Sequence, residues 1–165
     1  MRTGDEIFEA VTLTGNGGND TLYGSVFGET LVGNAGADSM WGAGGNDALY
    51  AVGSAAGDTM IGDAGQDTLS SSQGGADRFF YGGADDDVIR SSGSGRATVY
   101  GGSGNDLVQA VDDFPVVFAG DGNDSVFGGG SDSTEYFDGG EGDDFLRPGL
   151  DPIARRRHRP RLGRR

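Results

Sequence analysis

The sequence predicts an all-β solenoid, in which short strands and tight turns alternate and successive coils stack on one another. The nine-residue frame GGSGNDLVQ at 101–109 recurs in phase at 42–50, 62–70, 119–127 and 139–147. An apolar residue returns at position eight of every unit, and 34 glycines occur without the period of three that marks collagen. Self-similarity at a fixed short period is the signature of a stacked repeat architecture.

The chain divides into fourteen nine-residue units between residues 15 and 147, with one or two extra residues between some of them. The units are 15–23, 24–32, 33–41, 42–50, 53–61, 62–70, 72–80, 82–90, 92–100, 101–109, 110–118, 119–127, 130–138 and 139–147. We interpret each unit as a six-residue glycine turn followed by a three-residue strand. Two units then make one coil of 18 residues, which predicts a solenoid of about seven coils.

Two columns of residues define the frame. Position eight, the expected inward side chain of each strand, is Leu22, Leu31, Met40, Leu49, Met60, Leu69, Phe79, Ile89, Val99, Val108, Val117, Val126, Phe137 and Leu146. Position six is acidic in twelve units, at Asp20, Glu29, Asp38, Asp47, Asp58, Asp67, Asp77, Asp87, Asp106, Asp124, Glu135 and Asp144, and departs from this at Ala97 and Pro115.

The two ends of the chain fall outside the repeat. Residues 1–14, with Leu13 in phase, are expected to form an N-terminal cap strand, because terminal repeats of stacked folds are atypical. Residues 148–165 are rich in proline and arginine, and we expect a basic, disordered tail. The N-terminal residues lack a signal-peptide core, and no apolar stretch is long enough to cross a membrane.

The charge is distributed unevenly. Residues 1–150 carry 25 acidic and five basic side chains, a net charge of −20, whereas residues 151–165 carry seven arginines and one aspartate. An acidic body of this kind would repel nucleic acids and anionic membranes and attract cations. The absence of cysteine excludes disulfides and thiolate metal sites.

The glycines of positions one, two and four, the position-six aspartate and the apolar residue at eight resemble the RTX, or haemolysin-type, calcium-binding nonapeptide GGxGxDxUx over residues 15–147. The resemblance implies a parallel β-roll, a right-handed β-solenoid. It also implies that each Ca²⁺ lies between the turn of one unit and the turn of the unit after next. Turn carbonyls and position-six carboxylates would hold the ion, in keeping with the preference of calcium for oxygen ligands.

Carried over unit by unit, the resemblance implies a defined set of calcium ligands. The carboxylates are Asp20, Asp38, Asp47, Asp58, Asp67, Asp77, Asp87, Asp106, Asp124 and Asp144, and the turn carbonyls lie near Gly102, Gly104, Gly120, Gly122, Gly140 and Gly142. Alternate units form two columns, with five adjacent aspartate pairs in one and three in the other, so about eight ions are expected. The second column is predicted to be poor in calcium beyond Asp77. The alternative is a metal-free solenoid, in which aspartate merely caps each Gly-Asn-Asp turn.

The function predicted from the sequence is calcium binding that induces folding. One large inward side chain per nine residues makes a thin core, so ions that bind only the folded chain would supply much of its stability. The resemblance implies a secreted, extracellular protein, or a repeat segment of a larger exoprotein such as a toxin, protease, lipase or adhesin, exported by a type I secretion apparatus. The basic tail does not look like the usual export signal of that family.

An enzymatic role is less favoured, and a docking role is the main alternative. His158 is the single histidine, so neither a zinc-protease motif nor a histidine-based triad can form, and GxSxG is absent. The carboxylate clusters 85–87 and 112–113 are interpreted as solvated or calcium-facing turns. Position nine of the second column reads Tyr23, Trp41, Ile61, Phe80, Tyr100 and Phe118. This outward row stiffens the sheet or docks a partner domain, a second copy or a saccharide.

Overall fold

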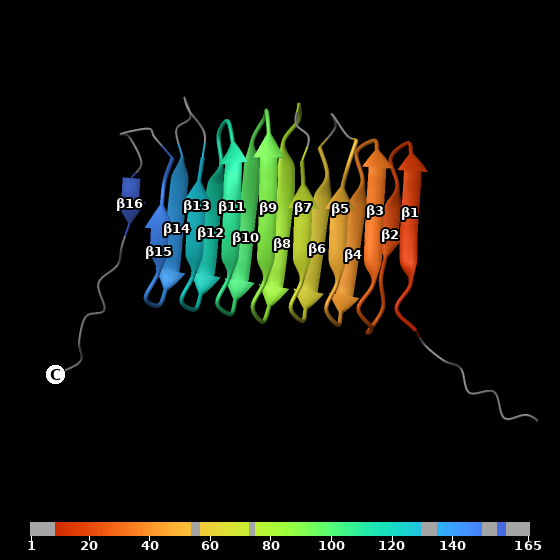
Figure 1. Cartoon of the computed structure of the whole chain (residues 1–165), viewed down its shortest axis with the longest axis horizontal. Helices are drawn as coiled ribbons and strands as arrows, with labels where there is room; N and C mark the ends of the chain where they lie inside the picture. Colours follow the sequence, from red (N-terminus) through yellow and green to blue (C-terminus); the bar gives the residue numbers. More distant parts are fainter. Residues whose placement is uncertain (1–8, 54–56, 73–74, 130–134, 150–154, 158–165) are drawn as a thin grey trace, which may run out of the picture.

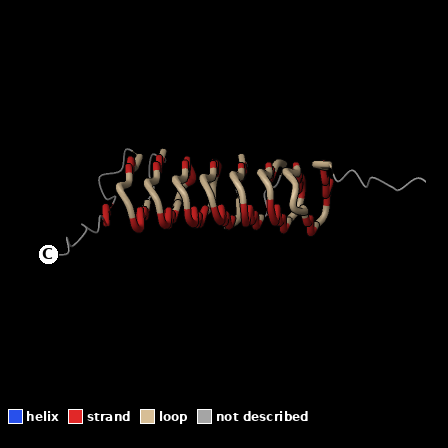
Figure 2. The backbone as a smooth tube through the Cα atoms, turned by 90° about the horizontal axis from the view of Figure 1, so that it is seen from below, coloured by secondary structure: helices blue, strands red, loops and turns tan. Residues whose placement is uncertain are grey.

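The chain forms a rod of two parallel β-sheets that face each other across a narrow core, as the computed structural model shows (Figure 1). The structure describes residues 9–53, 57–72, 75–129, 135–149 and 155–157. Odd-numbered strands make one sheet, here sheet A, in the order β1-β3-β5-β7-β9-β11-β13-β15, and even-numbered strands make sheet B, in the order β16-β14-β12-β10-β8-β6-β4-β2. Each coil therefore contributes one strand to each sheet, which confirms the predicted parallel β-solenoid. Figure 2 shows the coils following one another along the rod.

The strands are short and pair with the strand one coil away. Sheet A comprises β1 (Thr12–Gly17), β3 (Thr30–Ala35), β5 (Ala48–Ala51), β7 (Thr68–Ser71), β9 (Val88–Gly93), β11 (Leu107–Asp112), β13 (Ser125–Gly128) and β15 (Phe145–Arg147). Sheet B comprises β2 (Thr21–Tyr23), β4 (Ser39–Gly44), β6 (Thr59–Ala64), β8 (Arg78–Ala84), β10 (Ala97–Ser103), β12 (Val116–Asp121), β14 (Tyr136–Glu141) and β16 (Arg155–Arg157). β1 begins at Thr12, near the end of the segment expected to form a cap strand, and runs on into the first unit; residues 1–8 of that segment are outside the described residues. β16 lies within the tail that was expected to be disordered, and it pairs with β14. The rest of the tail beyond residue 149 is outside the described residues.

β2, β15 and β16 have the predicted three residues, but the other strands are longer, so the predicted strand length was wrong for most units. β10 runs for seven residues, and its register with β12 continues beyond Tyr100↔Phe118 into the glycines as Gly102↔Gly120. The glycine segments join successive coils through their own backbone hydrogen bonds. The repeat length also varies, since residues bonded between adjacent coils are 18 to 20 apart, for example in the Glu29–Asp47 and Asp47–Asp67 pairs.

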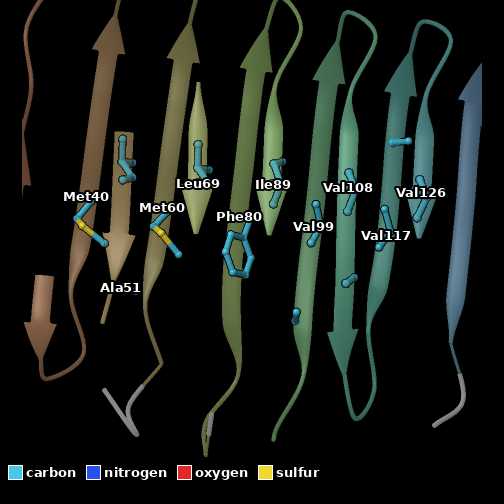
Figure 3. Packing of buried hydrophobic residues seen from close by; sticks show 14 of the residues in the cluster. Met40, Ala51, Met60, Leu69, Phe80, Ile89, Val99, Val108, Val117 and Val126 are labelled. Carbon is cyan, nitrogen blue, oxygen red and sulfur yellow. The ribbon is translucent and has the colours of Figure 1, made fainter. Parts of the chain in front are cut away.

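A single row of apolar side chains from each sheet fills the core (Figure 3). The predicted position-eight residues from Leu31 to Val126, with the one exception discussed next, are fully buried, and Phe137 is 4% exposed. Leu13, Leu22 and Leu146 are partly buried at the ends and pack against this cluster. The core is thin, because the neighbouring inward positions hold alanine, serine or glycine.

The exception is Phe79, which was predicted to lie in the core but is 40% exposed. Phe80 is buried instead, and it pairs in register with Met60 on one side and Val99 on the other. Figure 3 shows the Phe80 ring in the same row as Met60 and Val99. The unit assigned to 72–80 therefore begins one residue later. Because side chains alternate along a strand, this shift moves every side chain of β8 to the opposite face.

Candidate metal centre

The acidic residues of position six form a ladder along one edge of the rod, at the turns that lead from sheet B to sheet A. We call this set ladder 1: Glu29, Asp47, Asp67, Asp87, Asp106, Asp124 and Asp144. In each step the backbone N–H of one residue donates to the carboxylate Oδ1 of the next coil. The donor–acceptor distances run from 2.6 Å for Glu29 to Asp47 up to 3.0 Å for Asp124 to Asp144. The carboxylates are thus held in fixed orientation by the coil that precedes them.

The second oxygen of each carboxylate is buried and accepts no hydrogen bond. This holds for the Oδ2 atoms of Asp47, Asp67, Asp87, Asp106 and Asp124. The residues themselves are at most 3% exposed. Buried carboxylate oxygens carry a large desolvation cost unless they are paired with a cation or protonated. Along ladder 1 the fold therefore presents one such oxygen per coil, which is the ligand type that Ca²⁺ prefers.

A glycine at position one makes room beside each of these oxygens. A Cβ on Gly101 would come closer than 3.0 Å to both Asp106 Oδ2 and the carbonyl oxygen of Ala119 in the next coil. The same two kinds of oxygen flank Gly42, Gly62 and Gly82. A carboxylate oxygen and a main-chain carbonyl oxygen thus converge on the space that a side chain would fill. This cradle recurs along ladder 1.

The predicted turn glycines also bring carbonyls toward the neighbouring coil. All six have positive φ: Gly102 (122°), Gly104 (127°), Gly120 (122°), Gly122 (140°), Gly140 (85°) and Gly142 (139°). A Cβ on Gly120 would clash with the carbonyl oxygen of Gly102, and a Cβ on Gly122 with that of Gly104. Turn carbonyls therefore point along the rod axis from one coil to the next.

Burial raises the pKa values of the ladder carboxyls. The pKa rises to about 6 for Asp67 and Asp124 and to about 7 for Asp87, first because burial disfavours the charged form. Hydrogen bonds from the backbone oppose this rise, and the negative charges of adjacent rungs add to it. Without a cation these carboxyls thus lose their protons at a higher pH than exposed aspartates do. Within the described residues no three acidic or histidine side chains converge on one point, so a metal site here needs main-chain carbonyls as well.

The opposite edge, at the turns from sheet A to sheet B, starts in the same way and then changes. We call its position-six row ladder 2: Asp20, Asp38, Asp58, Arg78, Ala97, Pro115 and Glu135. The backbone N–H of Asp20 donates to Asp38 Oδ1, and that of Asp38 to Asp58 Oδ1, both at 2.9 Å, and the Oδ2 atoms of all three are buried without a hydrogen bond.

Arg78 then takes the place predicted for Asp77. Arg78 pairs in register with Ala97 and is buried, whereas Asp77 is exposed and lies outside the ladder. The structure thus groups nine of the ten predicted carboxylates into the two ladders and leaves Asp77 out. The pair 112–113 also differs from its interpretation as a turn facing solvent or calcium, because Asp112 is 1% exposed and forms an ion pair with Arg78.

A second row of hydrogen bonds, at position five, was missed by sequence reasoning. Asn105 Oδ1 accepts from the backbone N–H of Asn123 at 2.9 Å, and Asn123 Oδ1 accepts from that of Asp143 at 2.8 Å. The backbone N–H of Gln66 donates in the same way to Asn46 Oδ1. These bonds run in the direction opposite to those of ladder 1, so neighbouring coils are tied from both sides. The signal was present in the sequence as the recurring Asn-Asp pair.

The outward aromatic row on sheet B is present, with one member changed. Tyr81, not the predicted Phe80, lies in the row, because Phe80 is buried. Tyr81 and Tyr100 stack with ring centroids 5.0 Å apart and planes at 5°, and Tyr100 stacks on Phe118 at 5.3 Å. Tyr23 and Trp41 form a second stack at 5.0 Å. Among the described residues no helix is long and apolar enough to cross a membrane.

The sequence was compared with models of known protein families, and one family matches. The model for the RTX calcium-binding nonapeptide repeat matches residues 10–28, 23–51, 50–76, 91–110 and 116–146, which together exceed half of the chain. No curated protein and no solved structure matches the chain significantly. The repeat frame, the parallel solenoid and the carboxylate ladders agree with the family match. The chain belongs to the RTX calcium-binding nonapeptide repeat family.

Proposed function

We propose that this chain binds Ca²⁺ along its carboxylate ladders and that the ions hold successive coils together. Ladder 1 supplies five adjacent aspartate pairs, from Asp47–Asp67 to Asp124–Asp144. Ladder 2 supplies the two pairs Asp20–Asp38 and Asp38–Asp58. Because Asp77 is exposed, the pair that it would form with Asp58 is lost, and the proposed number of ions falls from about eight to seven.

The observation that carries this proposal is the row of buried Oδ2 atoms without hydrogen-bond partners. Four of these oxygens in ladder 1 lie beside a position-one glycine and next to a main-chain carbonyl oxygen of the following coil, namely those of Asp47, Asp67, Asp87 and Asp106; position one of the Asp124 unit is Ala119. A structural aspartate that only caps a turn would use its oxygens on nearby N–H groups. Here one oxygen of each carboxylate does so and the other is left for a cation.

Folding is proposed to depend on these ions. The apolar core is one side chain deep per strand, and the ladder places like charges in adjacent rungs. The pKa values show that the folded chain resists carrying those charges by itself. A cation that binds the folded form alone stabilises it by mass action. Calcium modules of extracellular proteins have dissociation constants of about 10⁻⁴–10⁻³ M, so such a chain stays unfolded where calcium is scarce.

The biological setting that we propose follows from family membership. RTX repeats are typical of secreted exoproteins, and we propose an extracellular protein or segment exported by a type I apparatus. The repeat domain is not catalytic in itself, and we propose no enzymatic activity for these residues. The aromatic row is proposed to stiffen sheet B, because its stacked rings turn their faces toward one another and their edges outward. Docking of a partner domain or saccharide on Tyr23, Trp41, Tyr81, Tyr100 and Phe118 remains the second candidate.

Isothermal titration calorimetry on the chelator-treated chain tests the binding step. We expect saturable binding of several Ca²⁺ ions per chain below about 1 mM free calcium. Mg²⁺ at the same concentration serves as the matched control and is expected to bind far more weakly, because it demands a stricter octahedral geometry and gives up its water reluctantly. Absence of binding up to millimolar calcium would refute the proposed function.

A further inference from the structure

The middle of ladder 2 contains a buried positive charge, the guanidinium group of Arg78. Arg78, at the start of β8, is 1% exposed and forms an ion pair with Asp112, also 1% exposed, at the end of β11. The guanidinium also donates to Ser71 Oγ at 3.2 Å and to the carbonyl oxygen of Ser92 at 3.0 Å. Ser91 completes the group by donating its hydroxyl to Asp112 Oδ2. These contacts connect sheet B, through β8, with three successive strands of sheet A: β7, β9 and β11.

The register places this cation where the ladder would continue. In the row at the start of the sheet B strands, Asp58 is followed by Arg78 and then by Ala97. Arg78 thus replaces a predicted carboxylate ligand and brings a positive charge beside Asp58, where that charge lowers the pKa of the Asp58 carboxyl and opposes the rise caused by burial. A guanidinium with several fixed donors can satisfy carboxylate and carbonyl oxygens together, as a bound metal ion would.

The surrounding residues have changed along with Arg78. The inward row beside ladder 2 reads Ala51, Ser71, Ser91 and Ala110, whereas the corresponding row beside ladder 1 reads Gly42, Gly62, Gly82, Gly101 and Ala119. Two of these residues, Ser71 and Ser91, are hydrogen-bonded to the ion pair. Arg78 and Asp112 also lie in the two stretches, 77–90 and 111–115, that fall between the matched ranges of the family model. The two members of the ion pair therefore come from two separate segments that the family model does not match and that meet in the folded chain.

We propose that the Arg78 guanidinium takes the place of calcium at this point of ladder 2, so that the central coils are joined along this edge by a buried ion pair and no metal. The proposal rests on the proposed calcium function and adds to it. It divides the rod into one edge that depends on calcium along its whole length and one edge that depends on calcium only up to Asp58. A buried ion pair is costly to break from one side, because the remaining charge is then left unpaired.

The test converts this point of ladder 2 back to the family pattern. In the double variant Arg78→Asp/Asp112→Ser, a carboxylate again follows Asp58 and no unpaired charge is left at residue 112. Equilibrium dialysis with ⁴⁵Ca²⁺ is expected to give one more bound ion per chain than in the unmodified protein. Arg90→Ser is the matched control, since it makes the same change in net charge at an exposed position of sheet A, and it should leave the ion count unchanged.

The outcomes separate the two proposals. If the unmodified chain binds calcium and the folded double variant binds no additional ion, the role of Arg78 is refuted while the calcium function stands. If the unmodified chain binds no calcium, the proposed function fails first. If the double variant does not fold even in saturating calcium, crystals of the unmodified chain grown in calcium decide the matter. Anomalous density is expected between Asp38 and Asp58 and not beside Arg78, and a calcium peak beside Arg78 would overturn the inference.

Discussion

The two edges of the rod are built from the same nine-residue frame but differ in the residues at position six. Ladder 1 keeps an acidic residue at every rung from Glu29 to Asp144, with a buried, unpartnered oxygen on each of the five aspartates from Asp47 to Asp124. Ladder 2 has three such aspartates, then Arg78, Ala97, Pro115 and Glu135. The first edge has the features of a continuous metal-binding edge. On the second edge, a salt bridge and small side chains replace those features beyond Asp58.

The difference between the two edges extends to the inward residue beside each rung. Beside ladder 1 the inward residue at position one is glycine in most coils, which leaves space next to the carboxylate. In the central coils beside ladder 2 the corresponding inward residues are Ala51, Ser71, Ser91 and Ala110, which carry side chains.

The largest effect is expected from removing one carboxylate of ladder 1. Asp87→Asn disrupts two proposed sites at once, with Asp67 and with Asp106, and is expected to raise the calcium concentration at the folding midpoint by tenfold or more. That factor corresponds to about 1.4 kcal/mol. Asp77→Asn is the matched control, because Asp77 occupies the same motif position in the sequence but is exposed. Equal effects of the two variants would contradict the assignment of the ladder.

The glycine cradle gives the next largest expected effect. In Gly101→Ala the new methyl group would clash with Asp106 Oδ2 and with the carbonyl oxygen of Ala119. Overpacking of this kind costs about 1–3 kcal/mol, and here it would also displace a proposed ligand. Gly17→Ala is the control, since its Cβ would meet only the carbonyl oxygen of Ala35, at 3.8 Å. Chemical denaturation in saturating calcium measures both, and a Gly101→Ala chain as stable as Gly17→Ala would count against the cradle.

The pH dependence of the calcium-free chain tests ladder 1 in another way. The pKa values of Asp67, Asp87 and Asp124 are raised from 3.8 to about 6, 7 and 6 in the folded chain. The folded state therefore binds protons more tightly than the unfolded state, and its stability falls as pH rises from about 4 to 7. In excess chelator we expect more β-structure at pH 5 than at pH 8. Calcium should reverse this trend, because its ligands must be deprotonated.

The pH prediction is checked by circular dichroism across that range with and without calcium. Asp87→Asn provides the internal control, because it removes the carboxyl with the highest pKa and should weaken the pH dependence of the calcium-free chain. A calcium-free chain whose order increases from pH 5 to pH 8 would contradict the electrostatic account of ladder 1.

The smallest expected effect concerns the position-five hydrogen bonds. Asn105→Ala removes the acceptor for the backbone N–H of Asn123 and is expected to cost about 0.5–1.5 kcal/mol, the usual net value of one hydrogen bond. Gln109→Ala, which removes an exposed side-chain bond to Arg90 on the outer face of sheet A, is the comparison and should cost less. Thermal unfolding in calcium measures the two, and a larger loss for Gln109→Ala would show that the asparagine row does not join the coils.

Much of the fold follows from periodicity in the sequence, because an apolar residue every ninth position can be buried only if the coils stack. The error at Phe79 has a local cause. Residues 72–80 contain Phe79 and Phe80 side by side, so the apolar position fits the sequence in either of two phases, and Asp77 at the acidic position favours the wrong one. Pairing of Phe80 with Met60 and Val99 decides between them, and that information lies in neighbouring coils.

The carboxylate ladder was predictable residue by residue, whereas the ion pair was not. Asp106, Asp124 and their equivalents repeat in phase, so each rung predicts the next. Arg78 and Asp112 are 34 residues apart and occupy different positions of the frame, and their contact depends on the one-residue shift of β8. The asparagine row could have been predicted, since Asn precedes Asp in several units, but only the stacked geometry reveals its partners.

The dependence of folding on calcium is measured by circular dichroism of the chelator-treated chain during a calcium titration at neutral pH. If ions along the ladders hold the coils together, the chain should be largely unordered without calcium and gain β-structure cooperatively below about 1 mM. A spectrum with full β-structure in excess chelator, unchanged on addition of calcium, would show that the apolar core and the backbone hydrogen bonds suffice, and would contradict the account.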